Sequence, residues 1–369
     1  MSARHAAVVA LNRIDPELGA FITVDPDAVL RAASDVRDGR LRGRLVAVKD
    51  LVDTVGLRTT YGTARYVDHH PERDAPVVAE LRAAGAIVLG KTNLNELAFG
   101  VSGHNPHFGA MLNPHDRGTT VGGSSGGSAV AVAAGVCTLA LGTDTSGSVR
   151  IPAALAGVWG LKCAHGLDLT GVYPLAPSYD SLGYLAANRA ELQRVLAIDT
   201  LPDPRQLRVG VVGTDVEPPP LPDEHWTVFN AEVWAVHGTA VVEHPQGYSA
   251  EFRRRVQAAG AHVDDAAERR ARQVEAAWRA EYAAAVAGFD VLVDRVVEGP
   301  APSVQTASDE DPRVQAELRQ RLLRHTPVAN ALGWPAVAFP TALGPRQVLG
   351  PPGSEAALLA VASDVGGRH

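Results

Sequence analysis

A run of glycines and serines, Gly122–Ser128, is the stretch with the clearest chemical potential. The apolar segment Ala129–Ala134 follows it, so the run is expected to form a tight loop that opens a helix. Such a loop can bind phosphate at the helix N-terminus. The P-loop pattern, however, needs a lysine and then serine or threonine after the last glycine, and Ser128-Ala129 stand there instead. A plain flexible Gly/Ser loop is the alternative for this stretch alone.

A second polar segment, Thr143–Pro152, holds a candidate nucleophile. A helix tolerates proline in its first turn, so Ser148 is expected in a loop just before a helix begins at about Pro152. The small residues Ser146 and Gly147 would let a substrate carbonyl approach the backbone, whose N–H groups could stabilise an oxyanion. A serine placed in this way attacks a carbonyl if a base removes its proton.

Lysine is the best candidate for that base. Only three of the 34 basic residues are lysines, namely Lys49, Lys91 and Lys162. Arginine keeps its proton in proteins, whereas a buried lysine can lose it. Lys49 follows the apolar strand Leu45–Val48, where burial would favour the neutral amine. An ion pair of Lys49 with Asp50 or Asp53 is the alternative.

The 13 histidines do not supply an evident base or metal site. His104 and His107 lie in one loop, but no further cysteine or carboxylate follows at the spacing of a metal site. These histidines therefore predict no metal site, and attack by a serine with lysine as the base needs no metal or organic cofactor.

Taken together, these motifs resemble the amidase signature family, which uses a Ser–cis-Ser–Lys triad. The resemblance rests on Val46–Asp50, Gly122–Ser128 and Gly142–Ala154, with support from Gly90–Glu96, Asn113-Pro114, Gly160–Lys162, Asp180 and Gly183. It runs almost continuously from about residue 20 to 186 and returns weakly at Asn330–Ala336.

The resemblance implies a role for each matching residue. Ser148 would be the nucleophile and Lys49 the base. Ser124, 24 positions before the nucleophile, would carry the proton between them, in a cis peptide. The oxyanion would be held by the backbone N–H groups of Thr145, Ser146, Gly147 and Ser148. The residues expected to support the site are Ser125, Asp144 and Arg150, and those expected to line the substrate pocket are Gly123 and Asp294. Lys91 and Lys162 are expected to be structural.

The second half departs from the family pattern. Family members are commonly longer, and Cys163 stands where a proline is usual. Asp294-Arg295 follows a strand where the family tends to have a threonine–proline turn near the pocket, so this charged pair either contacts substrate or forms a surface turn. The usual substrates of the family therefore cannot be transferred.

Apolar stretches alternate with amphipathic ones along the chain. The expected strands are Leu45–Val48, Ala86–Leu89, Cys137–Gly142, Leu207–Val212, Thr239–Val242, Asp290–Val293 and Pro335–Phe339. The expected helices are Asp27–Arg37, Ala75–Ala84, Gly127–Ala134, Ser249–Ala259, Ala266–Ala287, Val314–Arg324 and Glu355–Ser363. This alternation predicts an α/β fold of three layers, in which helices cover both faces of a mixed, mostly parallel twisted sheet.

We expect one domain over residues 1–369, in which 1–190 is the catalytic core, 191–330 a shortened variable region and 331–369 a shortened C-terminal part. Within the variable region, the Pro-rich stretch Val216–Asp223 is expected to be a surface loop or linker.

Composition narrows the class of protein. The net charge of −7 and the lack of a basic block argue against nucleic acid as a partner. The longest apolar run, Ala129–Leu141, is shorter than a membrane span, and Met1–His5 leads into no secretory signal. Two cysteines cannot form a disulfide framework, which favours the cytoplasm.

Three functions fit these observations. The leading one is hydrolysis of a small-molecule carboxamide through an acyl-enzyme, by a protein that works alone or as a homodimer. The second is an amidotransferase component that passes the same acyl group to ammonia or an amine. The third is a catalytically silent binding protein.

Overall fold

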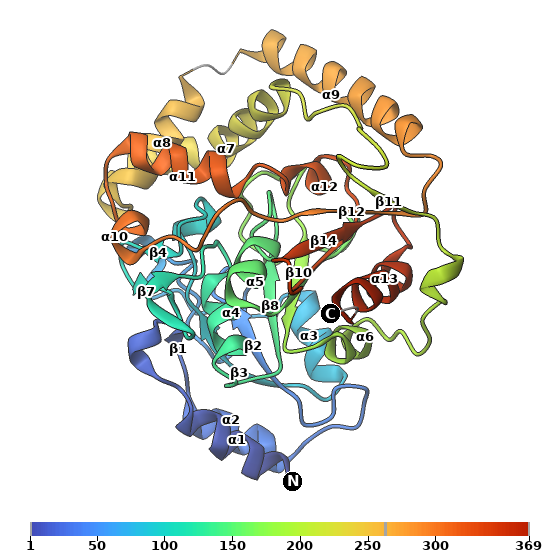
Figure 1. Ribbon diagram of the computed structural model, residues 1–369. Coiled ribbons are helices and arrows are strands. Elements are labelled where there is room, and N and C mark those ends of the chain that lie inside the picture. The colour runs from blue at the N-terminus through green and yellow to red at the C-terminus, as the bar shows by residue number, and fades with distance from the viewer. Residues whose placement is uncertain (1, 262–263, 368–369) are drawn as a thin grey trace.

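A ten-stranded sheet runs through the centre of the molecule (Figure 1). The computed structural model describes residues 2–261 and 264–367. From one edge to the other, the strands are β1 (Phe21–Thr23), β3 (Ile87–Thr92), β2 (Leu45–Lys49), β8 (Leu139–Thr143), β10 (Leu182–Ala186), β9 (Trp159–Lys162), β13 (Ala336–Phe339), β14 (Arg346–Leu349), β12 (Val291–Arg295) and β11 (Val209–Val211). Two small hairpins pair β4 (His104–Asn105) with β5 (Gly109–Ala110), and β6 (Leu112–Asn113) with β7 (Asp116–Thr120).

The chain also forms helices of very different lengths. They are α1 (Ala3–Asn12), α2 (Pro26–Ser34), α3 (Pro76–Ala83), α4 (Gly126–Ala133), α5 (Arg150–Ala156), α6 (Arg189–Val195), α7 (Glu224–Glu243), α8 (Ala250–Gly260), α9 (Asp265–Ala285), α10 (Val304–Ala307), α11 (Pro312–Leu322), α12 (Pro327–Ala331) and α13 (Glu355–Gly367).

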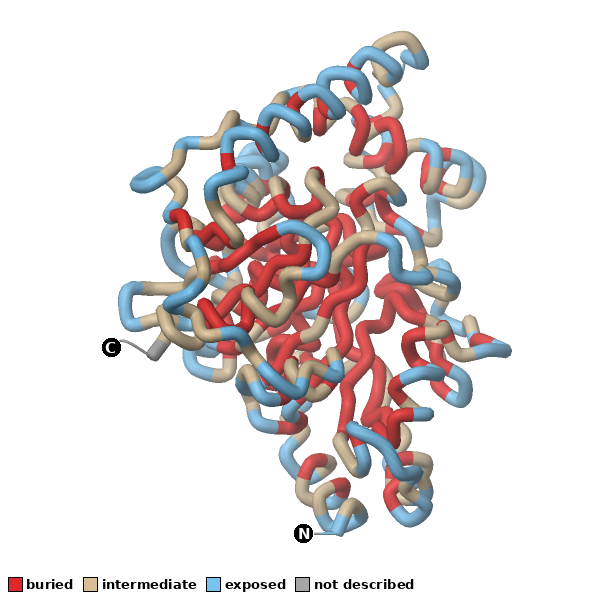
Figure 2. The backbone as a smooth tube through the Cα atoms, turned by 90° about the vertical axis from the view of Figure 1, so that its right-hand side faces the viewer, coloured by how far each residue is buried: buried red, intermediate tan, exposed pale blue. Residues whose placement is uncertain are grey.

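Alternate residues of the central strands point to opposite faces, and both faces are buried. Val46 and Val48 belong to the hydrophobic cluster that includes residues of α3, α6 and α13. Leu45 and Ala47 belong to the cluster that includes residues of α1, α2, α4 and α5. Figure 2 shows the same arrangement, with buried backbone in the middle and exposed backbone around it. The predicted three-layer α/β fold is therefore confirmed.

The expectation that the sheet is mostly parallel is wrong. Within the described residues, only the pairs β2–β3, β2–β8 and β11–β12 are parallel, and the other six neighbouring pairs are antiparallel. The prediction assumed a helical crossover after each strand, which parallel neighbours require. Instead β9 and β10, two strands that the periodicity did not reveal, are consecutive and adjacent, and a short loop joins β13 to β14.

The strand expected at Thr239–Val242 is also wrong, because these residues end the long helix α7. Val241 is buried on the same helical face as Val233 and His237, whereas Val242 is exposed. A run of four residues rich in β-branched side chains cannot separate a strand from a buried helical turn, and the helical spacing of the buried residues decides here. The other expected strands and helices overlap strands and helices of the structure, with ends shifted by a few residues.

Helices α7, α8, α9 and α11 lie together over one end of the central strands, at the top of Figure 1, and we call them the helical cap. Val228 of α7 and Val256 of α8 pack with Leu51, which follows β2, and with Leu97, which follows β3. The cap therefore covers the carboxyl ends of the parallel strands β2 and β3.

Gly127, at the start of α4, lies where this helix closely approaches the backbone that follows β3. A Cβ atom added there would lie 2.5 Å from backbone atoms of Ala20 and Asn93. Alanine normally stabilises a helix relative to glycine, yet we expect Gly127→Ala to lower the free energy of unfolding by about 1–3 kcal/mol through overpacking. Urea denaturation of the variant and the wild type measures this change in the free energy of unfolding. Gly288→Ala, where a Cβ meets open space, is the control and should stay within about 0.5 kcal/mol. An unchanged Gly127→Ala variant would contradict the close approach.

Candidate active site

Lys49 ends β2 in a fully buried position at the carboxyl edge of the sheet. Its Nζ atom donates hydrogen bonds to Ser124 Oγ at 2.8 Å and to Thr143 Oγ1 at 2.7 Å. Burial removes the hydration of the ammonium group and lowers the pKa of Lys49 to about 7, although the carboxylates of Asp144 and Asp180 oppose this shift. A substantial fraction of the amine is therefore neutral near pH 7.

The loop before α4 brings Ser124 to this lysine. The Gly123–Ser124 peptide bond is cis. The carbonyl of Ser124 accepts a hydrogen bond from the Asn95 N–H at 3.3 Å, and the Ser125 N–H donates to the carbonyl of Ser148 at 3.0 Å. The hydroxyl of Ser125 donates to the carbonyl of Thr143 at 3.1 Å. Ser124 thus contacts Lys49 directly, and the loop that carries Ser148 is joined to the Ser124 loop through the Ser125 N–H.

Asp144 and Arg150, which flank Ser148 in the sequence, form a buried ion pair. Arg150 donates from Nη2 to Asp144 Oδ1 at 2.9 Å and from Nε to Oδ2 at 3.1 Å, and neither side chain is exposed to solvent. Burial alone would raise the pKa of Asp144, but the charge and hydrogen bonds of Arg150 outweigh it and keep that pKa below its usual range. The predicted supporting role of both residues thus has a geometric basis.

Three side chains from the last part of the chain complete this network, and local sequence patterns assigned a role to none of them. Asn330 Oδ1 accepts from Arg150 at 2.6 Å, and Gln347 Oε1 accepts from the same guanidinium at 2.9 Å. The Thr326 hydroxyl donates to the carbonyl of Ser146 at 2.5 Å. Their contacts span about half the chain, so no local pattern could have identified them.

One of the predicted oxyanion donors has a hydrogen-bond partner within its own loop. The N–H of Gly147 donates to Asp144 Oδ1 at 2.8 Å, so it is already occupied. Within residues 2–261 and 264–367, the N–H groups of Thr145, Ser146 and Ser148 make no hydrogen bond. Gly147 has a positive φ of 125°, and a Cβ there would lie 2.3 Å from the Thr326 hydroxyl. Its part is conformational, because only glycine fits between the Ser148 loop and Thr326.

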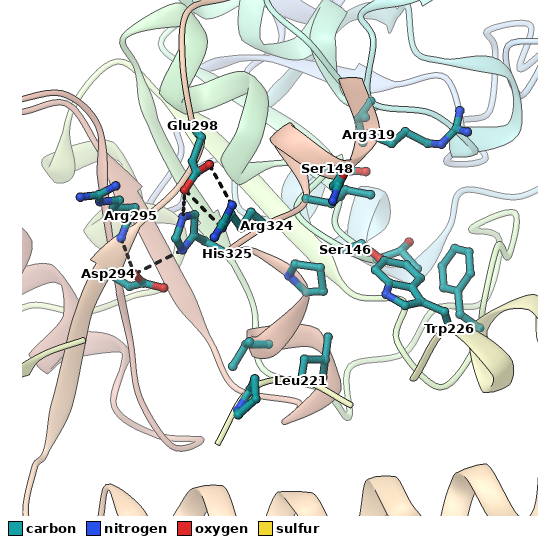
Figure 3. A pocket seen from close by; sticks show the side chains of 18 of the residues that line it. Ser146, Ser148, Leu221, Trp226, Asp294, Arg295, Glu298, Arg319, Arg324 and His325 are labelled. Carbon is teal, nitrogen blue, oxygen red and sulfur yellow. Dashed lines mark hydrogen bonds and ion pairs between the residues drawn. The ribbon is translucent and has the colours of Figure 1, made fainter. Parts of the chain in front are cut away.

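A cavity of about 1540 Å³ opens beside the nucleophile loop, and Thr145, Ser146 and Ser148 line it (Figure 3). The loop Val216–Asp223 contributes to its wall, so it is more than a linker. Gly123 is not part of the wall: it packs against the side chain of Asn95, which corrects its expected place.

Asp294 lines the cavity as predicted, together with Arg295, so this pair is not a simple surface turn. His325, whose role the sequence did not reveal, lies 3.6 Å from Asp294 and 3.4 Å from Glu298. Burial would lower the pKa of His325, but the hydrogen bonds and charges of these two carboxylates outweigh it and raise that pKa. The three residues form an acidic cluster on the cavity wall (Figure 3).

The other two lysines have partners that occupy them. Lys91 donates to the hydroxyls of Thr54 and Thr59, and its Nζ lies 3.8 Å from Asp50. Lys162 donates to the carbonyls of Cys163 and Trp334. Asp50 thus pairs with Lys91, and Asp53 lies 3.5 Å from His69. Neither carboxylate forms the ion pair with Lys49 that the alternative interpretation required.

Within the described part of the chain, no group of three or more histidine, cysteine or acidic side chains is arranged to hold a metal ion. None of the described helices combines the length and apolar character needed to cross a membrane.

The chain is similar to known proteins in both sequence and structure. The family model described as Amidase matches residues 5–232. Over 98% of its length the chain superimposes on 95% of a solved amidase, with a TM-score of 0.88 and 31% identical residues.

Two curated relatives are similar over the first part of the chain. The GatA component of the glutamyl-tRNA(Gln) amidotransferase of Archaeoglobus fulgidus is 39% identical over 224 residues, which cover 55% of this chain and 49% of that protein. The AtzE component of the 1-carboxybiuret hydrolase of Pseudomonas sp. (strain ADP) is 41% identical over 222 residues, covering 58% of this chain and 48% of that protein. The chain spans about half the length of these curated relatives.

The Asp144–Arg150 pair yields a stability prediction. Arg150→Met would leave the Asp144 carboxylate buried without its partner, so we expect the free energy of unfolding to fall by about 3–5 kcal/mol. Arg205→Met removes the exposed pair with Asp203 and should cause no measurable change. Urea denaturation of both variants measures the difference. Equal effects of the two substitutions would show that the buried pair does not stabilise the fold.

Proposed function

The chain belongs to the amidase family, and from this premise we propose that it hydrolyses the amide bond of a small-molecule carboxamide through an acyl-enzyme on Ser148. One observation carries the proposal. The buried Lys49 lies 2.8 Å from Ser124 Oγ, and its lowered pKa lets the neutral amine accept a proton near pH 7. A serine loop beside this relay, open to a large cavity, suits attack on a carbonyl.

In the first half of the reaction, Ser148 Oγ attacks the amide carbon while its proton passes through the Ser124 hydroxyl to Lys49. The carbonyl oxygen takes up the electron pair of the C=O bond. The free N–H groups of Thr145, Ser146 and Ser148 are the proposed donors to this oxyanion, and one such donor typically contributes about 10²–10³-fold in rate.

The tetrahedral intermediate then breaks its C–N bond. The proton held by Lys49 returns through Ser124 to the departing nitrogen, which leaves as ammonia or an amine. In the second half, water gives a proton to the same relay and attacks the ester of Ser148. The ester bond breaks, the acid is released, and the proton returns to Ser148 Oγ.

The proposal includes the setting of the enzyme. Cys137 and Cys163 are buried free thiols, which suits a reducing compartment such as the cytoplasm. We propose that the residues described here need no cofactor for the reaction. A homodimer is compatible with it, because the proposed catalytic side chains all come from one chain.

Acyl transfer is the second candidate, because several relatives are named as components of an amidotransferase. In that case an amine, rather than water, would attack the acyl-enzyme. Hydroxylamine added during turnover distinguishes the two functions: a transferase should yield mainly hydroxamate, and a hydrolase mainly the acid. A silent binding protein would form no product at all.

Replacing the proposed nucleophile and base tests the mechanism. Ser148→Ala and Lys49→Arg should each lower kcat/KM by about 10³-fold or more, since alanine cannot attack and arginine cannot accept the proton. Mass spectrometry with a fluorophosphonate should find one adduct on the wild type and none on Ser148→Ala. An adduct on Ser148→Ala, or an active Lys49→Arg variant, would move the chemistry to other residues. Unchanged circular dichroism controls for folding.

The lowered pKa of Lys49 predicts the acid limb of the pH profile. Only the neutral amine accepts a proton, and its fraction grows as the pH rises through the pKa of about 7. We therefore expect kcat/KM to rise about tenfold per pH unit below pH 7 and to level off above pH 8. A limb centred near pH 10 would indicate a hydrated lysine, and one near pH 4 a carboxylate base.

A further inference from the structure

The wall of the cavity carries an excess of positive charge. Its arginines are Arg255, Arg295, Arg319, Arg324 and Arg346, and its carboxylates are Glu217, Asp294 and Glu298. The chain as a whole is acidic, with a net charge of −7. A cavity whose sign opposes that of the chain concentrates anions near its wall.

The carboxylates of Asp294 and Glu298 lie in one part of the cavity and have arginines beside them. Arg324 pairs with Glu298 at 3.3 Å, next to the acidic cluster around His325. Figure 3 shows this cluster and Arg295 on one side of the view and Arg319 on the other, and both Arg319 and Ser148 line the cavity. Within the described residues, the guanidinium of Arg319 makes no hydrogen bond and no ion pair within 4.0 Å.

The packing of α11 fixes Arg319 beside the nucleophile loop. Leu318 and Leu322, on either side of Arg319 in this helix, pack against Ile151 of α5, which begins two residues after Ser148. Just beyond α11, the Thr326 hydroxyl bonds to the carbonyl of Ser146. Arg319 therefore lies on a helix whose position is fixed by packing against α5.

Arg255 of α8 adds a second guanidinium to the same wall. It stacks on the ring of Phe99 at 3.7 Å and donates a hydrogen bond to the carbonyl of that residue. Its nearest carboxylate, Glu251, is 4.0 Å away. Burial, and then the charge of Arg319, lower the pKa of Arg255 to about 9. The charge of Glu251 also acts on Arg319, while Arg254 adds further positive charge near both arginines. One carboxylate therefore offsets the charge of two guanidinium groups.

We propose that Arg319, with Arg255 beside it, forms a carboxylate-binding subsite, so that the substrate is an amide that also carries a carboxylate group. A planar guanidinium binds a carboxylate through two parallel hydrogen bonds, and the bound anion relieves the repulsion between the two arginines. This inference rests on the proposed hydrolysis at Ser148 and specifies which amides reach it.

Matched substrates test the subsite. Succinamate and glutaramate carry a carboxylate, and 4-oxopentanamide and 5-oxohexanamide replace that carboxylate with a methyl ketone of similar shape. The wild type should prefer the charged member of each pair by at least about 10-fold in kcat/KM. Arg319→Gln should lose about 10- to 100-fold on the carboxylates and less than about twofold on the ketones.

Arg313→Gln is the matched control, since Arg313 is an exposed arginine of the same helix outside the cavity wall. It should leave both members of each pair unchanged. An equal loss on charged and neutral substrates in Arg319→Gln would reveal a merely structural role for Arg319. If Arg319→Gln kept the wild-type preference for the carboxylate over the ketone substrates, the proposed subsite would be wrong.

A binding measurement separates this inference from the proposed function. Calorimetry with glutarate, the neutral diketone 2,6-heptanedione and inorganic phosphate requires no turnover. Glutarate should bind the wild type, and it should bind Arg319→Gln about 10-fold or more weakly. The diketone should bind both proteins more weakly than glutarate binds the wild type. If no amide is hydrolysed and the fluorophosphonate does not react, but glutarate behaves in this way, the subsite stands and the hydrolase proposal fails. No glutarate binding, or equal binding of phosphate, would overturn the carboxylate subsite.

Discussion

The buried ion pair between Asp144 and Arg150 is the interaction on which the site depends. Both charges lie in a protein interior, where an unpaired charge is costly, so each must find all its partners within the fold. Asp144 accepts from the N–H groups of Gly147 and Val149, which shapes the loop that carries Ser148. Arg150 reaches Asn330 and Gln347 with its remaining donors. The requirement that one ion pair be satisfied thus brings the last part of the chain against the nucleophile loop.

The lysines illustrate why geometry, and not the pKa alone, identifies the proposed base. Burial lowers the pKa of Lys49 and Lys162 to about 7 and that of Lys91 to about 8. Lys162 is surrounded by carbonyl oxygens, which can accept hydrogen bonds but cannot supply a proton, and Lys91 lies near a carboxylate. Both hydroxyl partners of Lys49 can donate as well as accept, and one of them is Ser124. Lys91 also donates to two hydroxyls, those of Thr54 and Thr59, but neither residue lines the cavity. Among the three lysines, Lys49 is therefore the one whose hydroxyl partner lies in the loop that is hydrogen-bonded to the Ser148 loop.

Much of the fold and the core of the candidate site could be predicted from local patterns. Periodicity located β2, β8 and α4, and the Gly/Ser motifs placed Ser124 and Ser148 at their ends. Antiparallel pairing escaped prediction because it depends on which strands become neighbours, and no residue pattern within a strand encodes this. Contacts such as Thr326 with Ser146 join residues 180 positions apart. Even within the recognised motif, the hydrogen bond of the Gly147 N–H to Asp144 was not predicted, since the direction of that side chain is determined by the fold.

Charge connects the ion pair, the base and the cavity. The carboxylates of Asp144 and Asp180 favour the ammonium form of Lys49, which would prevent it from acting as a base. Burial of the ammonium group outweighs both carboxylates, so the pKa of Lys49 still falls to about 7. Arginines on the cavity wall extend the same bias, since a positive wall opposes a further positive charge and favours a negative one. The arginines of the cavity wall therefore favour the proposed oxyanion at the Ser148 loop and an anionic group on the bound molecule, although the protein as a whole is acidic.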